Sequence, residues 1–175
     1  MLKWILGIVL LILFLVCLGI KIFDRDRRLS IAPCGMGINK VLYAEEQSWG
    51  IGLPGDNETG VIVFELPDVV SEQIEIQGIG YLESITCPVE LAIDRRGKYD
   101  RWQKTPILNG KEWRADAVEL NSYLDHYGFG IEINKTIELE INGAISGEGN
   151  FFSFGRTGII VLAPRTNRAY YFYAG

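Results

Sequence analysis

The chain ends in two apolar runs, Gly158-Ile-Ile-Val-Leu-Ala163 and Ala169-Tyr-Tyr-Phe-Tyr173, separated by Pro164-Arg-Thr-Asn-Arg168. β-branched and aromatic side chains favour strands, because they pack well on a pleated surface. Two such runs joined by a short polar link predict a β-hairpin. We therefore expect an antiparallel sheet at the centre of the fold.

Further strand patterns lie upstream of this hairpin. Val41–Ala44 is a short apolar run, and Val61–Leu66 is a β-branched run that stops at Pro67. Three other segments alternate apolar and polar residues with period two, which predicts half-buried strands with acids on the solvent face. These segments are Ile74–Ile79, Val89–Asp94 and Ile137–Ile141.

One longer segment, Asp116–Tyr127, has helical spacing, and Gly128 follows where a helix cap belongs. Its apolar positions are Ala117, Leu120, Leu124 and Tyr127. The segment 67–72 fits a single helical turn with Pro67 at its start. The expected fold class is α+β: a single N-terminal transmembrane helix, then a mainly antiparallel β-sheet domain with one amphipathic helix.

The N-terminal run Trp4–Ile20 holds no charged or amide side chain. Continued to Phe23 as a helix, it reaches the roughly 30 Å thickness of a bilayer core. We expect contact with the lipid bilayer through Trp4–Phe23. The predicted division is a transmembrane anchor at 1–23, a juxtamembrane linker at 24–38 and an extracytoplasmic β-rich globular domain at 39–175.

A cleaved signal peptide is the alternative interpretation of this run. The nearest small-residue cleavage pattern is Ser30-Ile-Ala32, which lies beyond a charged segment and is followed by Pro33. A lipid-attachment site at Cys17 is disfavoured by Val16, where a small residue is expected. The sequence favours an uncleaved anchor.

The flanking charges bear on orientation. Lys3 precedes the run, whereas Lys21, Arg25, Arg27 and Arg28 follow it, and the positive-inside rule would place that side in the cytoplasm. N-terminal anchors of this build commonly export the domain that follows. We expect a single-pass protein of the inner cell membrane with a periplasmic C-terminal domain. The positive charges that flank the run predict the opposite orientation.

Charge limits the class of partner. From Leu29 onward the chain carries 12 Lys and Arg against 20 Asp and Glu, a net charge near −8. Nucleic-acid phosphates require Lys and Arg, so no nucleic-acid partner is expected. An acidic domain suits a basic partner, or it serves solubility alone.

Two of the three cysteines, Cys34 and Cys87, fall in the domain. In an oxidising compartment they can form one disulfide, although sequence leaves open whether their Cβ atoms approach. No Cys-x-x-Cys pair occurs, which disfavours a zinc ribbon or a thioredoxin-type site.

His126 is the only histidine, and a structural role at a helix end is the favoured interpretation. A hydrolase using His126 with Asp125 or Asp94 is the enzymatic alternative. No Gly-x-Ser-x-Gly elbow supports it. We therefore expect no enzyme activity, no cofactor and no metal.

Two other patterns are interpreted as ordinary surface features without a functional role. Gly50–Gly55 has the spacing of a dinucleotide loop, but the turn-like Asp56–Gly60 follows instead of a helix. The acid pairs Glu45–Glu46 and Glu138/Glu140 are expected to be solvated.

The candidate partner-binding surface is the basic and aromatic segment Asp94–Trp102. Guanidinium groups beside rigid aromatic rings are typical of protein interfaces. An ordinary solvated turn and a contact with lipid headgroups are the alternatives. The residues proposed for this surface are Arg95, Arg96, Tyr99, Arg101 and Trp102.

These patterns together favour a membrane-anchored periplasmic protein-binding module. Its general plan is similar to that of immunity proteins that neutralise secreted bacterial toxins, although no motif carries the similarity. The alternatives are a cell-envelope hydrolase and a structural subunit of an envelope or secretion complex.

Overall fold

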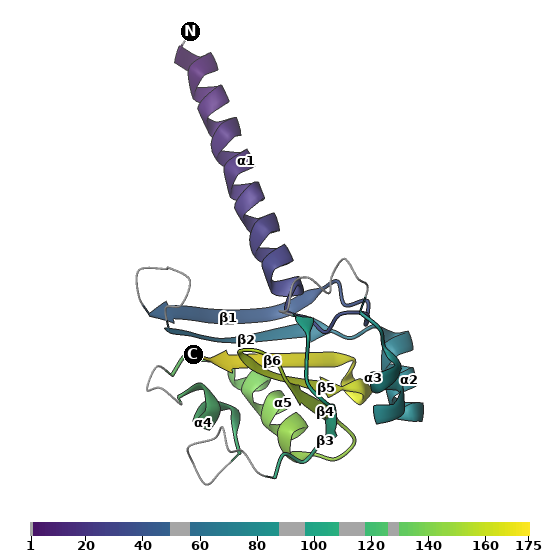
Figure 1. Ribbon diagram of the computed structural model, residues 1–175. Helices are drawn as coiled ribbons and strands as arrows, with labels where there is room; N and C mark the ends of the chain where they lie inside the picture. Colours follow the sequence, from purple (N-terminus) through teal and green to yellow (C-terminus); the bar gives the residue numbers. More distant parts are fainter. Residues whose placement is uncertain (1, 50–56, 88–96, 109–117, 126–129) are drawn as a thin grey trace.

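A computed structural model describes residues 2–49, 57–87, 97–108, 118–125 and 130–175. A long helix, α1 (Leu2–Leu29), projects from an α+β domain (Figure 1). By length and composition, Gly7–Leu29 is apolar enough to cross a membrane: it holds an 18-residue window with a mean hydropathy of 2.5, none of which is buried. An N-terminal helix of this kind is compatible with a membrane anchor or with a signal sequence.

The domain is built on a six-stranded antiparallel sheet with the strand order β1-β2-β6-β5-β4-β3. β1 lies nearest α1, and β3 is the far edge (Figure 1). The strands are β1 (Val41–Trp49), β2 (Asn57–Glu65), β3 (Gln103–Lys104), β4 (Phe151–Phe154), β5 (Gly158–Ala163) and β6 (Arg168–Ala174).

The predicted C-terminal hairpin is confirmed: β5 and β6 pair with Ile160 opposite Tyr171. The turn between them is the short 3-10 helix η2 (Pro164–Thr166) followed by Asn167 at φ 54°. Asn tolerates this left-handed conformation better than most residues, which explains its place at the turn.

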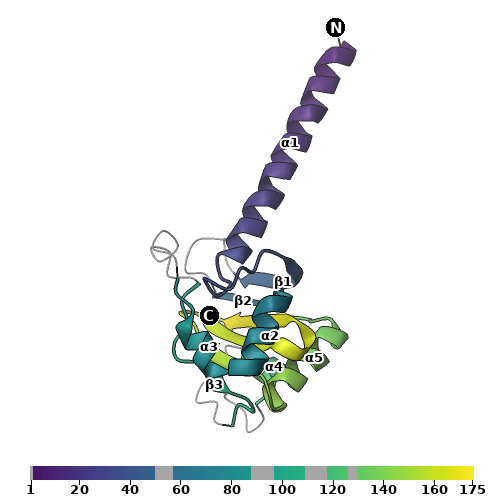
Figure 2. The same cartoon turned by 90° about the vertical axis from the view of Figure 1, so that its right-hand side faces the viewer.

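Helices cover both faces of the sheet, so its central strands are apolar on both sides. Tyr170 and Phe172 of β6 face one core, with α4 (Leu120–Leu124) and α5 (Lys135–Ser146). Tyr171 and Tyr173 face the other, with α2 (Asp68–Gln77) and α3 (Ile79–Ser84) (Figure 2). The domain is a three-layer sandwich.

Two predicted strands are wrong. Ile74–Ile79 lies in α2 and at the start of α3, and Ile137–Ile141 lies in α5. Ile76 and Leu139, which a period of two would bury, are 76% and 62% exposed. The buried residues follow helical spacing instead: Val70, Ser71 and Ile74 in α2, and Ile141, Ala144 and Ile145 in α5.

The expectation of one amphipathic helix is also corrected, because the described part of the domain contains α2, α3 and α5 besides α4. The helical turn expected at 67–72 is the beginning of α2, with Pro67 as its N-cap. Within Asp116–Tyr127, α4 covers only Leu120–Leu124. Residues 116–117, 126–127 and Gly128 lie outside the described residues, as do Gly50–Gly55 and the strand predicted at Val89–Asp94.

The segment expected as a linker, 24–38, differs from a free connector. α1 continues through it to Leu29, and Ile31, Ala32 and Met36 are buried in the core shared with α2. Part of this segment is therefore helical, and part of it belongs to the core of the domain.

Candidate functional site

The described part of the predicted partner surface folds inward. The Tyr99 hydroxyl donates to the Ile31 carbonyl oxygen at 2.8 Å. Its ring centre lies 6.2 Å from that of Trp102 and 6.4 Å from that of Tyr171. Burial raises the pKa of Tyr99 well above its usual value, so the hydroxyl stays protonated.

Tyr99 and Trp102 thus pack against the core, while Arg101 is exposed. Arg95 and Arg96 lie outside the described residues. The structure therefore does not gather the described aromatic residues of this segment into an exposed surface. Through the Tyr99 hydroxyl, this segment instead binds the chain that follows α1.

A charged cluster joins α1 to the sheet. Glu46 of β1 accepts hydrogen bonds at Oε2 from Arg27 at 2.9 Å and from Arg28 at 2.6 Å. Its Oε1 accepts from the Tyr173 hydroxyl at 2.9 Å. The Glu46 side chain is only 11% exposed, so the expectation that it is solvated is wrong. Burial, and then the negative charge of Glu46, raises the pKa of Tyr173.

A disulfide ties down the segment that follows α1. Cys34 and Cys87 are joined, with their Cα atoms 5.2 Å apart. The neighbouring Gly35 has φ +81°, and a Cβ there would lie 2.7 Å from the Thr86 carbonyl oxygen. Only glycine fits this close crossing of the two chains.

An open groove lies on the face of the sheet that α4 and α5 cover. It has a volume of about 760 Å³ and runs between α4, α5 and the segment 130–133. In Figure 1 α4 and α5 lie on one side of the sheet, and the segment 130–133 leads to Asn134, whose backbone amide donates to the Tyr43 hydroxyl of β1 at 3.3 Å. The groove is lined by Asn121, Ser122, Leu124, Asp125, Gly130, Ile131, Glu132, Ile133 and Glu138.

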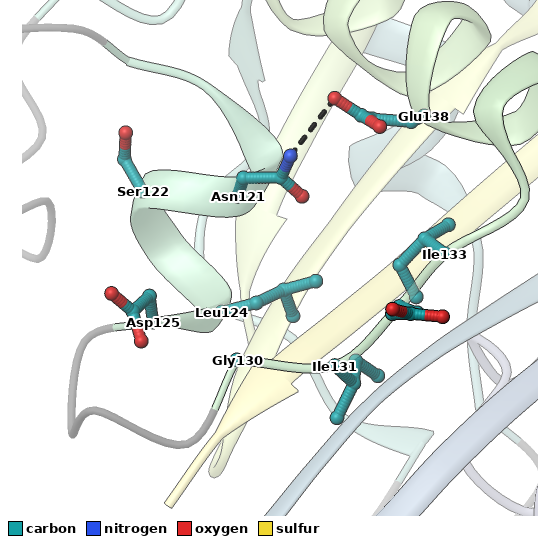
Figure 3. A pocket seen from close by; sticks show the side chains of 9 residues that line it. Asn121, Ser122, Leu124, Asp125, Gly130, Ile131, Ile133 and Glu138 are labelled. Carbon is teal, nitrogen blue, oxygen red and sulfur yellow. Dashed lines mark hydrogen bonds between the residues drawn. The ribbon is translucent and has the colours of Figure 1, made fainter.

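Hydrogen bonds between helices hold the groove open. Asn142 of α5 accepts from the Leu120 amide at 2.8 Å, which satisfies the first turn of α4. The side-chain amide of Asn121 donates to the Glu138 carboxylate at 2.9 Å across the groove (Figure 3). Lys135 also binds Glu138, with its Nζ 3.0 Å from each carboxylate oxygen. Glu138 therefore serves mainly to position α4 against α5.

The other two acids of the groove are open to a ligand. Asp125 and Glu132 are exposed, and Asp125 lies on the side of α4 away from Glu138 (Figure 3). Among the described residues no cluster of three metal-ligating side chains occurs. Carboxylates beside apolar Leu124 and Ile131 suit a Lys- or Arg-containing segment.

The sequence did not single out this groove. The sequence predicts Asp125 only as a partner for His126, which lies outside the described residues. It predicts Glu138 as a solvated acid on a strand, which is wrong, because Glu138 lies in α5 and its side chain is 13% exposed. Recognising the helical period of Lys135–Ser146 would have placed Glu138 near α4. No protein-family model, curated protein or solved structure matches the chain.

Proposed function

We propose that this chain is a membrane-anchored, extracytoplasmic protein-binding module whose groove takes a basic segment of its partner. The observation that carries the proposal is an open groove with the exposed carboxylates of Asp125 and Glu132, on the face of the sheet that α4 and α5 cover (Figure 1). A domain held at the membrane by α1 would leave this groove open to solution at its side.

The disulfide supports the extracytoplasmic side. Bonds such as Cys34–Cys87 persist in oxidising compartments and are rare in the cytosol. Two of the positive residues that argue for the opposite orientation, Arg27 and Arg28, bind Glu46. Their place in the sequence thus has a structural use besides topology.

The charge of the groove supports a basic partner. Asp125 and Glu132 offer carboxylates on a domain that is acidic as a whole, and such fields speed association with cations. A secreted toxin that acts at the membrane is one such partner, by analogy with anchored immunity proteins. The hydrolase alternative depends on His126, and we do not propose it.

A peptide-binding experiment tests the groove. The probe is a fluorescent nonapeptide of alternating Arg and Ser, with a Glu and Ser peptide as its control, added to the full chain in mild detergent. We expect the Asp125→Asn/Glu132→Gln variant to weaken binding of the Arg peptide at least threefold. Glu75→Gln/Glu83→Gln, which removes equal charge from exposed sites on α2 and α3, should leave it unchanged.

Equal loss in both variants would show a general charge effect and contradict the proposed site.

Partner capture from membranes by the full chain is the second experiment. A protein captured by the wild type and by Glu75→Gln/Glu83→Gln, but lost from Asp125→Asn/Glu132→Gln, is the expected result. If Asp125→Asn/Glu132→Gln captures the protein as well as the wild type does, the groove is not the binding site and the proposal is wrong.

A further inference from the structure

A second polar site lies where α1 meets the sheet. Arg25, Asn39, Lys40 and Val41 line a notch of about 420 Å³. The Arg25 guanidinium donates from Nη2 to the Asn39 carbonyl oxygen at 3.1 Å, which holds it beside the start of β1. Within the described residues Arg25 makes no other hydrogen bond or ion pair, so its remaining N–H groups are open.

The position of the notch along α1 matches the headgroup layer of a bilayer. Twenty helical residues from Trp4 to Phe23 span about 30 Å, the thickness of the hydrocarbon core. Arg25 then lies about 3 Å beyond the core, and Leu29 lies about 9 Å beyond it. Each headgroup layer is roughly 5–7 Å thick, so the notch falls within it or at its outer edge.

The charges around the notch favour an anion. At 100° per residue, Lys21 lies about 40° from Arg25 around α1, whereas Asp24 and Asp26 point about 100° to either side of Arg25. Lys40 pairs with Glu65 at 2.9 Å, with the two side chains 57% and 46% exposed. Such a solvated pair is weak, and Lys40 can exchange it for a phosphate.

We propose that this notch binds the phosphate of an anionic phospholipid, and that the lipid holds the domain against the membrane surface. A guanidinium offers a fork of N–H groups that matches phosphate oxygens, and Lys40 adds a second positive charge. The inference rests on the proposed insertion of α1 in a bilayer. Because Glu46 and the disulfide fix α1 to the domain, a lipid at the notch would set the orientation of the whole domain.

Native mass spectrometry of the full chain, released from detergent micelles, tests the lipid site. Dioleoylphosphatidylglycerol is titrated against dioleoylphosphatidylcholine. We expect the wild type to retain the anionic lipid with at least fivefold preference, since one Lys or Arg near the surface is worth about that factor. Arg25→Gln/Lys40→Gln should lose the preference. Lys104→Gln/Arg165→Gln, which removes exposed charge on β3 and η2, should keep it.

Equal retention of the two lipids by the wild type, or a preference that survives Arg25→Gln/Lys40→Gln, overturns the inference. Glycerol phosphate is the soluble arm: displacement of the lipid by millimolar glycerol phosphate would assign the notch to a free phosphate and contradict the lipid. Incorporation into liposomes is measured in parallel. A chain that fails to incorporate refutes the anchor, whereas one that incorporates without lipid preference refutes the notch alone.

Discussion

Glu46 connects three groups that come from distant parts of the sequence. Its carboxylate accepts from two arginines at the end of α1 and from Tyr173 near the C-terminus. Truncation to Ala leaves these donors without their acceptor in a half-buried setting. We expect Glu46→Ala to lower the free energy of unfolding by about 2 kcal/mol, measured by urea denaturation of the full chain in mild detergent.

Glu45 provides the matched control, because neighbouring residues on a strand point to opposite faces. Glu45→Ala should change the free energy of unfolding by less than about 0.5 kcal/mol. Equal losses in the two variants would contradict the role given to Glu46.

Tyr173 makes the stability of the contact between α1 and the sheet depend on pH. Burial and Glu46 raise its pKa in the folded state, whereas Tyr173 in the unfolded chain titrates at about 10. The folded state then binds more protons above that pH, so the contribution of Tyr173 to stability is constant below about pH 10 and is lost as the pH rises further. Tyr99, Tyr170 and Tyr171 act in the same direction.

Urea unfolding between pH 9 and 11 measures this fall. Tyr173→Phe removes one titrating group, so the decline above pH 10 should become shallower by up to about 1.4 kcal/mol per pH unit. An unchanged slope would show that Tyr173 ionises in the folded state as it does in the unfolded chain.

At the scale of elements, α5 shows where a repeating pattern misleads. Ile141 is fully buried and Leu139 is 62% exposed, although a strand would place both on one face. We expect Ile141→Ala to cost about 2–4 kcal/mol of unfolding free energy, and Leu139→Ala less than about 0.5 kcal/mol. Thermal and urea unfolding of the two variants measure the difference, and equal costs would favour a strand.

The sequence was informative where one period dominated. The hairpin of β5 and β6 consists of uninterrupted apolar runs around a Pro–Asn turn, so its type and boundaries were predictable. In Ile137–Ile141 the period of two is real but short, and helical spacing appears only when Ala144 and Ile145 are included. Tertiary packing decided between the two periods.

The groove and the junction were beyond sequence reasoning for a different reason. Asn121 meets Glu138 and Glu46 meets Arg28 only after the chain has folded. From the sequence, Cys34 and Cys87 could be either bonded or free, and nothing in it decided between the two. Nor did it show that the two chain segments approach closely at Gly35. Contacts between residues far apart in the chain leave no periodic signal.

For the whole molecule, the feature that matters most to the proposed function is the continuity of α1 with the domain. The helix ends at Leu29, and Ile31, Ala32 and Met36 are buried just after it. Glu46 binds the last turn of α1, and the disulfide at Cys34 ties the following segment to Cys87. An anchor joined in this way would fix the direction in which the groove faces, rather than leave the domain on a flexible tether.

The side of the membrane on which the domain lies is the central claim, and cysteine labelling tests it most directly. Intact cells that express the full chain with Cys17→Ser are treated with a membrane-impermeant maleimide. The account predicts that Cys34 and Cys87 resist labelling until an impermeant reductant is added, and then react without lysis. Labelling that appears only after lysis would place the domain in the cytoplasm and contradict the account.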